Sequence, residues 1–248
     1  MTLAQGSLLA AAATAAGLIN SIAGGGTLVT FPALLAAGVS PVAANATNTL
    51  AVWAGQLSGS LAYRRHLGEV RRTAILLAVP SILGGLIGSV LLLALPERTF
   101  EAVVPWLIVF ACALLALQDQ VKLLITRVRG HDHPAALWFI QLLVSIYGGY
   151  FGAGIGIIML AAMGILLPTS QQHANALKVL FSFLANGVAA LIFLGAGAAR
   201  LPEAALMAVF ALLGGWLGAR VAQRLNPAGM RTIAIAVGLY AAARLFAR

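Results

Sequence analysis

Charge is scarce in this sequence: only 8% of its 248 residues are Asp, Glu, Lys or Arg. Soluble domains carry about a quarter charged residues. This chain is also 61% hydrophobic, and its mean hydropathy is +0.99. These proportions exclude an ordinary soluble domain and indicate an all-α polytopic membrane protein.

Cysteine is almost absent, because Cys112 is the only one, so neither an internal disulfide nor a cysteine-based metal site is expected. The HExxH, GxSxG and Walker A patterns are missing, and no cofactor signature is present. We therefore predict that the protein is not an enzyme and holds neither cofactor nor metal. The +9 formal charge comes largely from basic residues in short loops, which is typical of membrane insertion rather than of nucleic-acid binding.

Hydropathy divides the chain into ten apolar segments. They are 5–23, 27–38, 42–63, 72–95, 101–119, 135–152, 154–167, 172–196, 203–221 and 229–246. Those at 27–38 and 154–167 are shorter than the roughly 20 residues that a helix needs to cross a bilayer. We predict about eight transmembrane helices plus these two short, broken or re-entrant segments.

The two halves of the sequence match at a constant offset of 130 residues over about 70 residues, as Gly24 and Gly154 or Asn45 and Asn175 illustrate. The predicted organisation is a first transmembrane repeat, a polar linker and a second transmembrane repeat, at 1–120, 121–134 and 135–248. Duplicated halves with interrupted helices are typical of secondary transporters, whose substrate sites lie near the midplane. The basic residues do not decide whether the repeats are parallel or inverted.

One polar stripe stands out within segment 172–196. It consists of Asn175, Lys178, Ser182 and Asn186, whose spacing of three, four and four puts them on one helix face. A lysine near the centre of a membrane helix costs on the order of 2.5–3.5 kcal/mol, and all six acidic residues fall in predicted loops or at segment ends. Lys178 therefore either meets an anionic ligand, which we favour, or extends its ammonium to the membrane interface.

The first half carries a matching stripe at the same offset, and we expect the two stripes to converge on one central site. Its polar members are Asn45, Asn48 and Gln56, with Thr49 beside them. Glycine clusters next to the two short segments would expose backbone N–H groups to an anion. We expect the GxxxG pairs Gly84/Gly88 and Gly214/Gly218 to serve helix packing instead. His173 is interpreted as a helix cap, with proton carrier as the alternative.

Together these motifs resemble the sulfite exporter TauE/SafE family. The likeness is carried by GLINSIAGGGTLVTFPALLAAGVSPVAANATNTLA (17–51), GGYFGAGIGIIMLAAMGILLPTSQQHANALKVLFSFLANGVAALIF (148–193) and the tail GARVAQRLNPAGMR (218–231). The resemblance implies a multi-pass transporter of the bacterial inner membrane that exports sulfite, sulfoacetate or a related sulfur-containing anion. Pro32 matches the family's first repeat, but position 162 is alanine, so the two broken segments are not expected to be identical.

The sequence thus predicts a secondary transporter of a small oxyanion such as sulfite or an organosulfonate. An anion channel and a non-transporting membrane scaffold are the alternatives. The expected partners are the small anionic substrate and the lipid bilayer, with no nucleic acid; a coupling proton or ion and a homodimer remain open. The candidate substrate-binding residues are Lys178, Asn45, Asn48, Thr49, Gln56, Asn175, Ser182, Asn186, Gly24, Gly25, Gly26, Gly152, Gly154 and Gly156.

Overall fold

The computed structural model describes residues 1–22, 25–62, 64–127, 134–167, 170–221 and 227–247, and all regular structure within them is α-helical. The first half forms α1 (Leu3–Ile22), α2 (Thr27–Ala36), α3 (Pro41–Ala62), α4 (Arg64–Glu69), α5 (Arg71–Ala94) and α6 (Glu97–Ala116). The rest forms α7 (Gln118–Arg127), α8 (Pro134–Tyr150), α9 (Ile155–Leu166), α10 (Gln171–Gly195), α11 (Leu201–Val221) and α12 (Pro227–Phe246).

The ten apolar segments read from hydropathy coincide with ten of these helices. Among the described residues, six helices are long and apolar enough to cross a membrane: α1, α5, α6, α10, α11 and α12. Helices α2 and α9 have 10 and 12 residues, about 15 and 18 Å at 1.5 Å per residue, so both are too short to cross, as predicted. The total of about eight crossings, which would add α3 and α8, stays a prediction.

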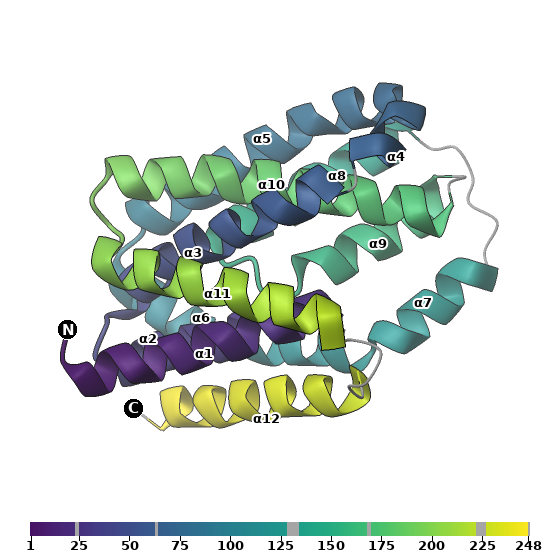
Figure 1. Cartoon of the computed structure of the whole chain (residues 1–248). Helices are drawn as coiled ribbons and strands as arrows, with labels where there is room; N and C mark the ends of the chain where they lie inside the picture. Colours follow the sequence, from purple (N-terminus) through teal and green to yellow (C-terminus); the bar gives the residue numbers. More distant parts are fainter. Residues whose placement is uncertain (23–24, 63, 128–133, 168–169, 222–226, 248) are drawn as a thin grey trace.

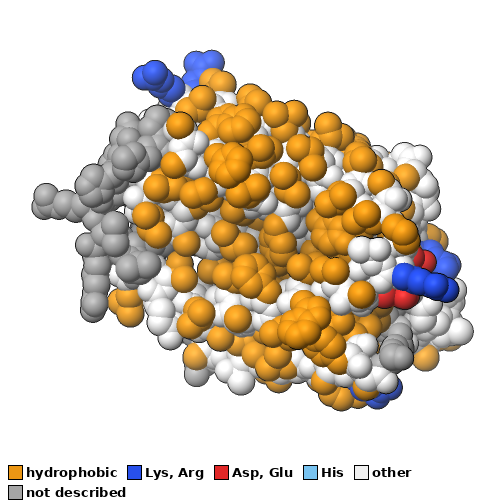
Figure 2. Space-filling model, turned by 180° about the vertical axis from the view of Figure 1, so that it is seen from behind, with side chains coloured by type: hydrophobic (Ala, Val, Ile, Leu, Met, Phe, Trp, Pro, Cys, Tyr) orange, Lys and Arg blue, Asp and Glu red, His pale blue; other side chains and the backbone are white. Residues whose placement is uncertain are grey.

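Large apolar side chains cover the outside of the helix bundle. On α11, for example, Val209 and Trp216 are 56% and 53% exposed. Figure 2 shows hydrophobic side chains spread over one whole face, with Lys and Arg toward its edges. An apolar surface this continuous is far larger than the patches that soluble monomers expose. The chain is therefore a multi-pass membrane protein whose lipid-facing surface surrounds the bundle.

Two helices were not predicted. Helix α4 (Arg64–Glu69) lies between two long helices, and α7 (Gln118–Arg127) occupies much of the segment 121–134 that was interpreted as a polar linker. Helix α7 is amphipathic and packs against α9, so this part of the segment forms regular structure. Its Asp119 is also tied to α12 by an ion pair of 2.8 Å with Arg231.

The two halves interlock rather than forming separate bodies. Helix α1 packs along α11 and α5 packs along α8, and the 130-residue offset relates α1 to α8 and α5 to α11. In both contacts the helix backbones approach each other closely. A Cβ on Gly88 would lie 2.1 Å from Ile146 O, and one on Gly214 would lie 2.1 Å from Thr14 O. For these two members of the GxxxG pairs, the predicted packing role is confirmed.

The corresponding helices α3 and α10 run in opposite directions, side by side (Figure 1). Near the start of α3, the Thr47 hydroxyl accepts a hydrogen bond of 2.9 Å from the Arg200 N–H, just beyond the end of α10. Beyond the other end of α3, Glu69 contacts His173 in the first turn of α10. Opposite directions in matching helices are the arrangement of an inverted repeat, which the sequence had left undecided.

The two ends of the bundle differ in charge. Figure 1 places both termini at one end, and α4, α7 and the end of α11 at the other. Among the described residues, that other end carries Arg64, Arg65, Arg71, Arg72, Lys122, Arg127, Arg220 and Arg231. In the same described part of the chain, the end with the termini has Arg98, Arg200 and Arg244. By the positive-inside rule, we expect the termini to lie outside the cytoplasm.

Candidate functional site

Glycines form the sharp connection between α8 and α9. Gly152 and Gly154 both have φ of +77°, a left-handed conformation that strains any residue with a Cβ. In the first half, Gly25 has φ of +92°, and Gly26 donates its N–H to Asn20 Oδ1 at 2.8 Å just before α2. Gly24 lies outside the described residues. The predicted glycine clusters therefore do interrupt the two corresponding helix pairs.

The glycine segment 152–156 lies along the polar stripe of α10. A Cβ placed on Gly152 would be 3.6 Å from Oδ1 of Asn186. One placed on Gly156 would be 3.2 Å from Cδ of Lys178. The two ends of this short segment thus face two members of the stripe that are two helical turns apart.

Lys178 is half-buried, and its ammonium bonds to a neighbouring side chain of the same stripe. Nζ donates to Oδ1 of Asn175 at 3.3 Å, and the aliphatic stem lies against Gly156. At the start of α9, the N–H groups of Ile155 and Ile157 bond to Gly152 O and Gly154 O. The Gly156 N–H between them makes no such turn bond among the described residues, so the lysine stem lies beside the positive end of α9, where an N–H group is left to donate.

The two polar stripes meet at one pair of amides. Asn186 Nδ2 donates to Gln56 Oε1 at 3.2 Å, and the two residues are 130 apart in sequence. A contact between positions related by the repeat must lie on the axis that relates the two halves. The pair therefore marks the centre of the bundle, where α3 and α10 cross.

Away from this crossing the stripes diverge, contrary to the expected single convergence. Asn48 precedes Gln56 by eight residues, and Lys178 precedes Asn186 by eight, which is about 12 Å along each helix. Because α3 and α10 are antiparallel, Asn48 and Lys178 lie on opposite sides of the crossing. The structure thus brings together the candidates of the second half with Gln56, and leaves the other first-half candidates apart.

Those first-half candidates are buried and largely engaged with neighbouring atoms. Asn48 accepts a hydrogen bond from the Thr30 hydroxyl, and the Thr49 hydroxyl donates to Asn45 O at 2.9 Å. Asn45 Nδ2 donates to Tyr150 O, also at 2.9 Å. The side-chain donors of Asn45 and Thr49 thus serve backbone carbonyls, which makes these two residues poorer oxyanion ligands than the sequence suggested.

Ser182 and Trp53 complete the surroundings of the crossing. The Ser182 hydroxyl points toward Met159 Sδ at 3.5 Å. Trp53 stacks on Phe183 with ring centroids 5.7 Å apart. Its indole Nε1, however, is a buried donor without a partner among the described residues. Sequence reasoning missed this donor, although Trp53 lies one turn before Gln56, where a shared helix face could have signalled it.

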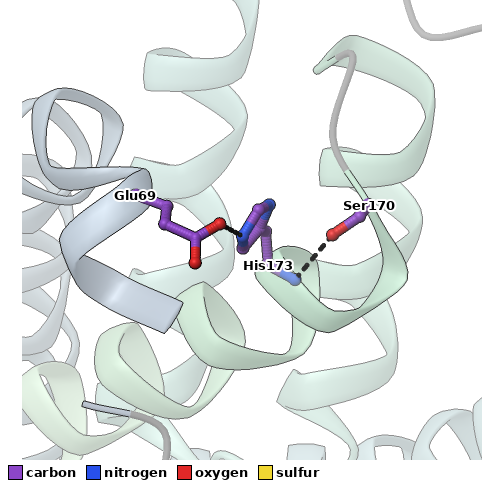
Figure 3. A network of polar contacts seen from close by, with 3 residues as sticks. All are labelled: Glu69, Ser170 and His173. Carbon is purple, nitrogen blue, oxygen red and sulfur yellow. Dashed lines mark hydrogen bonds and ion pairs between the residues drawn. The ribbon is translucent and has the colours of Figure 1, made fainter. Parts of the chain in front are cut away.

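His173 does not cap α10 with its side chain, so that interpretation is wrong. Ser170 is the cap, because its hydroxyl accepts the His173 backbone N–H at 3.2 Å. The imidazole instead reaches across to the other half of the molecule, and its Nε2 lies 2.9 Å from Glu69 Oε2 (Figure 3). The pair is on the solvent side of the site, with the Glu69 side chain 68% exposed.

Comparison with known proteins places this geometry in context. A family model described as "Sulfite exporter TauE/SafE" matches residues 9–245. A probable membrane transporter protein, ORF9, from Sinorhizobium sp. is 30% identical over 95% of this chain and 90% of its own length. A probable membrane transporter protein from Haemophilus influenzae is 32% identical over 83% and 80%. The probable membrane transporter protein YfcA of Escherichia coli K12 is 30% identical over 85% and 76%. No solved structure matches.

Proposed function

The chain belongs to the sulfite exporter TauE/SafE family and is a membrane transporter protein, and we propose that it exports a small sulfur-containing oxyanion such as sulfite or an organosulfonate. Membership of a transporter family favours a role without catalysis. The family description supports the substrate class and the direction of export, and the relatives' names support transport in general.

The observation that carries the proposal is the position of the glycine segment 152–156 along α10. It lays the aliphatic stem of Lys178 against the first turn of α9, and the helix dipole and the Gly156 N–H at that turn both favour negative charge. At the other end of the segment, Asn186 and Gln56 offer amide donors at the crossing of α3 and α10. One cation with several neutral donors matches a small anion whose charge is spread over oxygen atoms.

The substrate site that we propose consists of Lys178, Asn175, Ser182, Asn186 and Gln56, with the backbone of Gly152, Gly154 and Gly156. Trp53 joins it, because an indole N–H buried near the crossing can donate to a sulfonate oxygen. Gly25 and Gly26 form the matching interruption in the other half. In an inverted repeat the site would open alternately to the two sides by rocking of one half against the other.

The decisive experiment uses calorimetry to measure how tightly the purified protein binds sulfite and a sulfonate. The sulfonate is either taurine or sulfoacetate. Lys178→Ala should weaken binding by about 1.5–3 kcal/mol, the size of a hydrogen bond to a charged group, which is roughly 10- to 150-fold. Lys122→Ala, which removes the chain's other lysine, is the matched control and should bind as wild type. Equal affinity of wild type and Lys178→Ala would place the substrate site elsewhere.

Uptake into proteoliposomes separates a transporter from an anion channel. Flux of radiolabelled sulfite should saturate with concentration and should be accelerated by unlabelled anion on the opposite side. Flux that rises linearly with concentration and shows no exchange would favour the channel. Absence of both flux and binding would favour the scaffold.

A further inference from the structure

Asn45 presents a buried acceptor that the substrate site does not explain. The residue is 1% exposed, and its Oδ1 has no hydrogen-bond partner among the described residues. The orientation of the amide is set by its other end, because Nδ2 donates to Tyr150 O at 2.9 Å. Turning the amide over would point Oδ1 at that carbonyl oxygen. A buried acceptor without a donor costs free energy, so a positively charged partner at this oxygen would stabilise the structure.

The corresponding asparagine in the second half already has a positively charged partner. Asn175 stands at the same repeat position as Asn45, and its Oδ1 accepts from the Lys178 ammonium at 3.3 Å. The repeat position that holds Lys178 in the second half holds Asn48 in the first. A fixed ammonium therefore meets the asparagine oxygen in one half, and no side-chain cation stands at the matching position in the other.

The surroundings of Asn45 favour a cation over an anion. Tyr150 is the last residue of α8, where the partial charge of the helix is negative. The carbonyls here converge: Tyr147 O accepts the N–H groups of both Phe151 and Gly152, and the Tyr147 hydroxyl donates to Ala153 O. Carbonyl ends of interrupted helices coordinate small cations in other transporters. The nearby Arg200 contacts Thr47 only through its backbone, and that residue is exposed.

We propose that Asn45 Oδ1 and the carbonyl end of α8 bind a sodium ion, which takes the place that the Lys178 ammonium fills in the second half. A neutral amide oxygen is too weak a base to hold a proton at neutral pH, which excludes a proton at this site. Divalent cations favour carboxylate ligands, and no group of three or more His, Cys, Asp or Glu residues exists among the described residues.

Sodium at this site would be coupled to the anion through the connection between α8 and α9. Tyr150, at one end of that connection, contacts Asn45, while Gly152 and Gly156 face Asn186 and Lys178. An ion that orders residue 150 also orders the segment that lines the anion site, and the coupling is reciprocal. This second part rests on the proposed function, whereas the sodium site itself does not.

The site is tested by thermal unfolding in detergent with NaCl titrated against choline chloride at constant ionic strength, and with KCl in a parallel series. Wild type should gain a saturable rise in Tm with sodium, larger than with potassium. Asn45→Leu should fold and lose the sodium response. Gln141→Leu is the matched control: Gln141 is also fully buried with an unpartnered Oε1 among the described residues, but it lies within continuous α8. It should keep the response.

Direct binding of radioactive ²²Na⁺ to wild type tests the sodium site even if Asn45→Leu fails to fold. Saturable binding is expected, and its absence would overturn the proposal, as would an unchanged sodium response in folded Asn45→Leu. Sodium should also raise sulfonate affinity at least about 5-fold, the lower end of typical couplings. Sodium binding without that effect would overturn the coupling alone. If Lys178→Ala binds the anion as tightly as wild type while wild type still binds sodium, the proposed anion site alone would be overturned.

Discussion

Adding one methyl group at Gly156 should disturb Lys178 without disturbing the fold. The new Cβ would lie 3.2 Å from Cδ, 3.6 Å from Cγ and 3.9 Å from Cε of Lys178. The optimal separation of two non-bonded carbon atoms is about 3.5–4.0 Å. The flexible Lys178 side chain must therefore move away by about 0.3–0.8 Å. Gly156 is not among the glycines with positive φ, and alanine favours helix by about 1 kcal/mol over glycine. Gly156→Ala should therefore unfold at the same temperature as wild type or higher.

The displaced ammonium should bind the anion less well. If the shift costs about half of a charged hydrogen bond, the loss is about 0.7–1.5 kcal/mol, or roughly 3- to 12-fold in Kd. Calorimetry with a sulfonate measures this directly. Gly195→Ala is the control, because a Cβ there has nothing within 4 Å and Gly195 is also helical. In a Lys178→Ala background the Gly156→Ala effect should disappear.

Two outcomes would refute this reasoning. If Gly156→Ala weakens anion binding equally with and without Lys178, the methyl group acts on the ligand or the backbone and not through the lysine. If the variant loses stability, the start of α9 is less tolerant than its backbone angles indicate.

Three further predictions follow from the crossing, the solvent side of the site and the charge of the two ends. In a double-mutant cycle, Gln56→Ala and Asn186→Ala should each cost about 0.5–1.5 kcal/mol by removing the hydrogen bond between the two amides, with a coupling energy of similar size; strictly additive losses of unfolding free energy would mean that the two amides do not bond. His173→Gln should change the pH dependence of transport only modestly, because it removes a contact with the exposed Glu69 side chain on the solvent side of the site; loss of all pH dependence with binding intact would make His173 a proton carrier. In intact cells, a membrane-impermeant maleimide should label Thr2→Cys and not Gln120→Cys, both of which are exposed positions at opposite ends of the bundle; the reverse pattern would invert the assigned orientation.

Much of the architecture could be predicted from the sequence, because the lipid bilayer restricts the composition and length of each continuous stretch that crosses it. Every span must be apolar and long enough, so the ten apolar segments mark ten helices to within a few residues. The glycines at 152 and 154 were recognisable for a similar reason, since few other residues adopt a positive φ. Helices α4 and α7 were not predicted because short helices need not meet this length rule and form where packing permits.

The sequence by itself determined the class of the protein, the repeat offset and the presence of a lysine within a membrane helix. Only the tertiary structure decided that the two halves run in opposite directions. That reversal separates Asn48 from Lys178 and leaves the Gln56–Asn186 pair as the one shared point of the two stripes. It also revealed that Nε1 of Trp53 and Oδ1 of Asn45 are buried without a hydrogen-bond partner in the described part of the chain. Periodicity tells which face of a helix a side chain occupies, but the partner across that face depends on contacts between residues more than a hundred positions apart.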